Sequence, residues 1–175
     1  MGPNRLKAIV ISAVMAALAL TLPVAFHAVG MGSRFLPMLL PLLLNGFLVP
    51  FPWAVGVAFL VPWISALATG MPPLYPPVAA VVSAEGVALA GVASLLYRRG
   101  RKNVWSALIP AVIAGRCTAL LAMWILAKAF ALPPALSAVA SVLEGLPGVV
   151  LQLAVVPPVL HALSKRRSLL LDDGG

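Results

Sequence analysis

Residues 81–127, VVSAEGVALAGVASLLYRRGRKNVWSALIPAVIAGRCTALLAMWILA, contain two long apolar runs separated by a short basic stretch. Each run can cross a bilayer as a helix, because about 20 apolar residues span the hydrocarbon core. Each run also holds one charge well inside it, Glu85 in the first and Arg116 in the second. A charged side chain inside a membrane helix is costly, so this pattern indicates a functional site.

The composition of the whole chain agrees with a membrane protein. Apolar residues make up 62% of the 175 residues and charged residues 9%, and the mean hydropathy is +1.09. So little polar surface excludes a soluble globule. The net charge of +8 lies in short clusters between apolar runs, which is typical of membrane-flanking loops and argues against nucleic-acid binding. The single cysteine, Cys117, excludes an internal disulfide. We predict an all-α integral membrane protein.

The apolar runs predict six transmembrane helices, because a backbone in lipid must satisfy its hydrogen bonds internally. They lie at residues 6–26, 35–50, 52–69, 77–97, 104–128 and 136–163. Prolines at 37, 41 and 62 predict kinks or broken turns in the second and third segments. A cleaved signal peptide is the alternative for the first segment, which lacks a convincing A-x-A site. Residues 1–168 are expected to form one six-helix domain, followed by a flexible tail at 169–175.

The distribution of basic residues predicts the orientation. Lysines and arginines gather at 5–7, 98–102 and 165–167 on one predicted side, against Arg34 and Lys128 on the other. Since cytoplasmic loops carry the excess of basic residues, both termini should be cytoplasmic.

A third charge, Glu144, lies inside the last segment. At about 1.5 Å per residue, Glu85, Arg116 and Glu144 lie roughly 12, 18 and 12 Å below the outer surface, so they can share one site. The alternative is a buried ion-pair network that only fastens the helices together.

Other side chains could complete a small-molecule site around this trio. Flat aromatic rings can hold a flat ligand while a few polar groups orient it. The candidates are Gln152, Asn45, Trp63, Trp124, Tyr75, His27 and Arg34. The alternative for the aromatic residues is an interfacial belt, and for His27 a plain connector with an interfacial histidine.

Small residues on the first segment suggest a docking surface. Ala13 and Ala17 are one helical turn apart, a spacing that permits close approach of a partner helix.

Motifs of catalysis are missing from the chain. There is no G-x-x-x-x-G-K-[ST] phosphate loop, no H-E-x-x-H and no G-x-S-x-G. We therefore expect neither an enzyme nor a cofactor or metal. A solitary small secondary carrier or channel, with Glu85 and Glu144 as a proton relay, is the alternative to a substrate-binding subunit.

The order of several short motifs resembles a known family. They are GMGSRFLPM at 30–38, NGFLVP at 45–50, ATGMPP at 68–73, LYRR at 96–99, AGR at 114–116, and GLPG at 145–148 followed by Gln152. Together they resemble the substrate-binding S-component of energy-coupling factor (ECF) vitamin transporters, over nearly the whole chain.

The resemblance implies both a function and partners. Such a protein captures a vitamin or related micronutrient in the outer half of a six-helix bundle, in a bacterial or archaeal cell membrane. It joins a membrane coupling subunit and two cytoplasmic ATPases, and its first helix docks through an A-x-x-x-A pattern that Ala13 and Ala17 reproduce.

Overall fold

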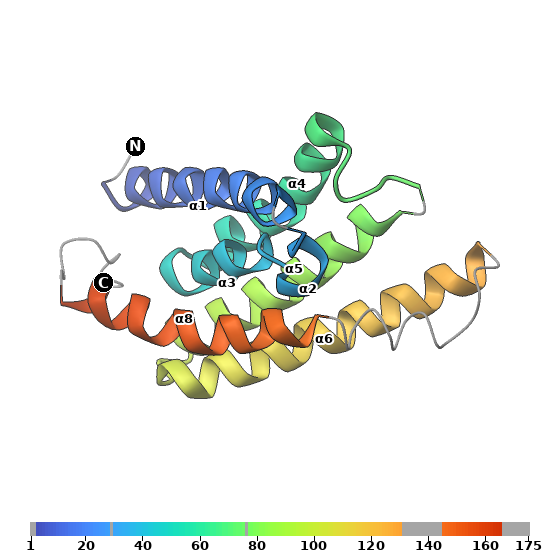
Figure 1. Ribbon diagram of the computed structural model, residues 1–175. Coiled ribbons are helices and arrows are strands. Elements are labelled where there is room, and N and C mark those ends of the chain that lie inside the picture. Colours follow the sequence, from blue (N-terminus) through green and yellow to red (C-terminus); the bar gives the residue numbers. More distant parts are fainter. Residues whose placement is uncertain (1–2, 29, 76, 131–144, 166–175) are drawn as a thin grey trace.

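The computed structural model describes residues 3–28, 30–75, 77–130 and 145–165 (Figure 1). Throughout these residues the regular structure is helical. The elements are α1 (Pro3–Ala28), α2 (Gly32–Phe35), α3 (Leu39–Leu48), α4 (Phe51–Thr69), α5 (Val78–Ser94), its π-helical continuation η1 (Leu95–Arg99), α6 (Val104–Ala129) and α8 (Leu146–Ser164). The predicted tail at 169–175 and Glu144 lie outside the described residues.

Five of these helices are long and apolar enough to cross a membrane: α1, α4, α5 with η1, α6 and α8. The sixth apolar helix, α3, has 10 residues. It is therefore about 15 Å long, half of a bilayer core of about 30 Å. The prediction of an all-α membrane protein with six apolar helical segments is confirmed.

The second predicted segment, 35–50, is shorter than expected. Leu36 adopts a left-handed backbone conformation with φ of 46°, and helix α3 begins only at Leu39, after Pro37. This is the break expected at Pro37. Pro41 lies in the first turn of α3, where its missing N–H is tolerated, and α4 continues through Pro62.

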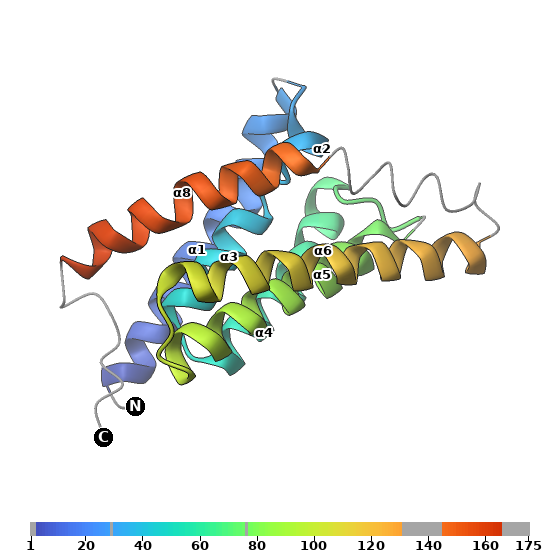
Figure 2. The same ribbon diagram turned by 90° about the horizontal axis from the view of Figure 1, so that it is seen from below.

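Helix α5 lies at the centre of the bundle, packed against α3, α4 and α6 (Figure 1). Helix α1 packs on α3 and α4, and α8 meets α2 at its beginning (Figure 2). Glycines allow the close approaches. A Cβ on Gly46 would lie 2.5 Å from the Ala90 carbonyl oxygen, and one on Gly86 3.4 Å from that of Ala58. Small residues of this kind are how membrane helices pack tightly.

Helix α3 is fixed at its carboxyl end by two hydrogen bonds from α5 and η1. Ser94 Oγ donates to the Val49 carbonyl at 3.3 Å, and Arg98 Nη1 donates to the Leu48 carbonyl at 3.2 Å. The last carbonyls of a helix have no partner within it, so these donors satisfy groups that would otherwise be buried unpaired. All residues of α3 except Leu40 are buried.

Candidate functional site

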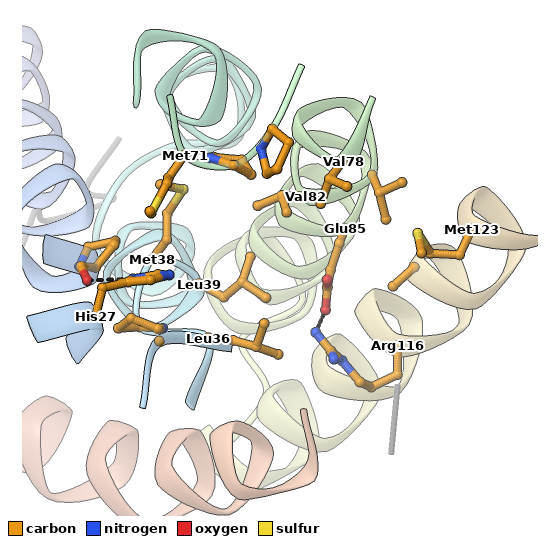
Figure 3. A pocket seen from close by; sticks show the side chains of 17 residues that line it. His27, Leu36, Met38, Leu39, Met71, Val78, Val82, Glu85, Arg116 and Met123 are labelled. Atoms are coloured by element: carbon orange, nitrogen blue, oxygen red, sulfur yellow. Dashed lines mark hydrogen bonds and ion pairs between the residues drawn. The ribbon is translucent and has the colours of Figure 1, made fainter. Parts of the chain in front are cut away.

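A cavity of about 480 Å³ lies where α1 ends, α3 begins, and α5 and α6 face each other (Figure 3). That volume falls within the usual range for small-molecule sites, about 300–1,000 Å³. Its walls are mostly apolar. It is lined by Pro23, His27, Gly32, Leu36, Pro37, Met38, Leu39, Met71, Pro72, Pro73, Val78, Val81, Val82, Glu85, Arg116, Ala119 and Met123.

Glu85 of α5 and Arg116 of α6 form an ion pair in the wall of this cavity (Figure 3). Their side chains are 5% and 14% exposed, respectively. The two helices come close at this level because Gly115, next to Arg116, packs on Leu89, one turn beyond Glu85. Two of the three predicted charges therefore meet at one site, and a charged pair in an apolar cavity can orient a polar ligand.

His27, at the end of α1, lies at the opposite side of the cavity (Figure 3). Its Nδ1 lies 2.7 Å from the Pro23 carbonyl oxygen. A carbonyl can only accept, so Nδ1 carries the proton. The imidazole lies against Gly32, where any Cβ would overlap the ring. The chain reaches this position through Gly30, whose φ of 72° suits glycine.

The loop between α4 and α5 forms another wall. Met71, Pro72 and Pro73 line the cavity, and Ser65 Oγ holds this loop by donating to the Met71 carbonyl at 2.7 Å. Sequence reasoning missed Met71, together with Met38 and Met123, as lining residues. Their thioethers are soft and adaptable, which suits contact with an aromatic ring. No motif marks such residues, because only the fold brings them together.

Two other predicted polar residues are buried outside this lining. Asn45 is 0% exposed and accepts a hydrogen bond from Ser12 Oγ at 3.4 Å, while its Nδ2 has no partner among the described residues. Gln152 is 1% exposed, and neither its Oε1 nor its Nε2 has a partner within the described part of the chain. Both remain predictions as ligand contacts.

The predicted aromatic residues also lie outside the lining. Tyr75 is 80% exposed and packs edge-on against Phe130. Trp124 is exposed, with Lys128 Nζ 3.8 Å from the centre of its ring. Trp63 is half-buried, and its indole N–H is buried without a partner among the described residues.

The remaining predicted residues fall into two groups. Arg34 belongs to α2, but its side chain is not described, and Glu144 lies outside the described residues. Ala13 and Ala17 are exposed on α1, whereas Ala8 and Ser12 of the same helix are buried against the bundle.

Comparison with known proteins identifies the family to which the chain belongs. The profile of the ECF transporter, substrate-specific component, matches residues 7–160. No curated protein matches the chain, and no solved structure does. The match covers most of the sequence and, in full or in large part, each of the six apolar helices among the described residues. This multi-pass membrane protein therefore belongs to the substrate-specific components of ECF transporters.

Proposed function

We propose that this protein captures a vitamin or related micronutrient with high affinity from the outer side of a bacterial or archaeal cell membrane. It then delivers this ligand to an ATP-driven importer. The observation that carries the proposal is the cavity of about 480 Å³ with the Glu85–Arg116 ion pair in its wall. The apolar walls would exclude water, and the pair would provide directional hydrogen bonds.

The proposed position of the ligand is in the outer half of the bundle. With cytoplasmic termini, α1 runs outward, so its end at His27 lies toward the outside, as does the loop at Met71–Pro73. Both belong to the cavity lining. A ligand arriving from outside would therefore meet the cavity before crossing the bundle.

The proposed partners are a membrane coupling subunit and two cytoplasmic ATPases. Helix α1 is the least covered of the spanning helices. In its most apolar stretch 11% of the residues are buried, against 22% to 56% in the other spanning helices. Ala13 and Ala17 lie on its exposed surface. Small side chains there would let a partner helix approach closely.

The test is purification in detergent followed by native mass spectrometry for a co-purified small molecule. The identified compound is then offered to proteoliposomes. We expect tight binding by the protein alone and uptake only after the coupling subunits and ATP are added. Uptake by the protein alone would instead support the solitary carrier, in which Glu85 relays protons.

A second test addresses the docking surface. Ala13→Leu and Ala17→Leu should block assembly with the coupling subunit while leaving ligand affinity intact, because the added methyl groups keep the helices apart. Ala25→Leu changes an exposed residue near the carboxyl end of α1. This variant is the matched control and should assemble normally. Assembly of all three at normal yield would contradict docking through this surface.

A further inference from the structure

We propose that the cavity takes a net-neutral heterocycle whose ring edge carries an N–H donor beside a carbonyl or ring-nitrogen acceptor. The other end of this ligand donates a hydrogen bond to His27. The inference rests on the proposed capture function and names the class of substrate. Cyclic amides, cyclic ureas and amidine-like ring edges belong to this class.

The charge of the ligand follows from the charges in the wall. Glu85 and Arg116 carry the only full charges among the described lining residues, and they neutralise each other. An anionic or cationic ligand would bring an unbalanced charge into a largely apolar cavity, which is costly. A ligand of zero net charge avoids this cost.

The pattern of hydrogen-bonding groups follows from the atoms that the ion pair leaves unused. The contact joins Glu85 Oε1 and Arg116 Nη2. Glu85 Oε2 remains available as an acceptor and the other guanidinium N–H groups as donors, on two residues that both line the cavity. In a ring edge that has an N–H next to a carbonyl oxygen or ring nitrogen, the N–H can donate to the Glu85 carboxylate. The neighbouring oxygen or nitrogen can accept from the Arg116 guanidinium. Both hydrogen bonds are then assisted by charge.

The second anchor is on the opposite side of the cavity. His27 Nδ1 is engaged by the Pro23 carbonyl, so in the neutral ring Nε2 is the acceptor, and it has no partner among the described residues. The ring is held in place by this hydrogen bond and by Gly32. Figure 3 shows His27 on one side and the Glu85–Arg116 pair on the other, with Leu39 between them.

The walls between the anchors suit the face of a ring. Met38, Met71 and Pro72 present thioethers and an apolar ring edge, and sulfur makes favourable contacts with aromatic systems. An elongated, flat molecule can therefore contact both anchors while its faces remain against apolar side chains.

The experiment uses matched probes on the detergent-purified full chain. Four ring systems, pyrimidine, pyridine, purine and pteridine, are each tested as the cyclic amide, its N-methylated form and its carboxylated form, by calorimetry and thermal shift. We expect at least one cyclic amide to bind, and its N-methylated and carboxylated forms to bind at least tenfold more weakly. His27→Ala should weaken binding without changing this order.

Variants that change the charge of Glu85 or Arg116 test whether the ion pair causes the preference for a neutral ligand. Glu85→Gln leaves Arg116 as an unbalanced cation, so the carboxylated probe should become the better ligand by at least tenfold. The double variant Glu85→Gln/Arg116→Gln is neutral again and should keep the preference for the uncharged form. Arg99→Gln, an exposed arginine outside the lining, should behave like the unaltered protein.

Other outcomes overturn the inference. A preference of the unaltered protein for a carboxylated probe, indifference to N-methylation, or no binding of any cyclic amide would reject this substrate class. In the first two cases the protein still captures a small molecule, so the proposed function stands. If no probe of any charge binds and no compound co-purifies, the capture function fails as well.

Discussion

Replacement of Gly46 by alanine tests the contact on which the position of α3 depends. A Cβ at Gly46 would lie 2.5 Å from the Ala90 carbonyl oxygen and 2.9 Å from Ala90 Cα, so the obstacle is backbone and cannot rotate away. Gly56, inside α4, is the matched control, because a Cβ there would meet nothing within 4 Å. Both substitutions should stabilise their helix by about 1 kcal/mol, because alanine has a higher helix propensity than glycine.

The difference between the two variants isolates the packing cost. Overpacking costs about 1–3 kcal/mol, so Gly46→Ala should be less stable than Gly56→Ala by that amount. For a chain of this size the melting temperatures should then differ by about 2–12 °C. The assay is thermal unfolding in detergent, followed by ligand binding, which Gly46→Ala should also weaken because Met38 and Leu39 line the cavity. Equal melting temperatures would refute the close contact between α3 and α5.

Three further predictions concern the cavity and α6. Gly32→Ala puts a methyl group where the His27 ring lies, so it should weaken binding about as much as His27→Ala. The losses should not add in the double variant, and calorimetry showing additive losses would contradict the contact. Asn103 Oδ1 accepts from Ser106 N at 2.8 Å at the start of α6, so Asn103→Ala should lower the free energy of unfolding by about 1 kcal/mol. Chemical denaturation should show no such loss for Lys102→Ala. Arg116→Ala should weaken ligand binding by about 2 kcal/mol or more, roughly 30-fold; unchanged affinity with a lower melting temperature would indicate that the pair only fastens α5 to α6.

The helices could be predicted from the sequence because lipid leaves the backbone few choices. The same constraint makes a charge inside an apolar run conspicuous, so the sequence alone singles out Glu85 and Arg116. Depth along a helix follows from residue counting, so charges of opposite sign at similar levels were natural candidates for a common site.

Rotation about the helix axis could not be predicted in the same way. Trp124 of α6 is a plausible ligand contact by depth, yet it is exposed and lies outside the cavity lining. Tyr75, in the loop between α4 and α5, is also exposed and outside the lining, because hydropathy does not give the path of a loop. The length of α3 depends on the left-handed turn at Leu36, which hydropathy does not reveal. The lining methionines have no motif, since their proximity arises from the packing of elements distant in sequence.

The two ends of α3 connect distant parts of the protein. Its carboxyl end is tied by Ser94 and Arg98 to the segment that precedes the basic turn, and its amino end supplies Leu39 to the cavity wall. A helix about 15 Å long moves as a rigid body. If residues 98–102 move while α3 stays in place, these two hydrogen bonds must break, and if α3 moves with them, Leu39 shifts in the cavity wall.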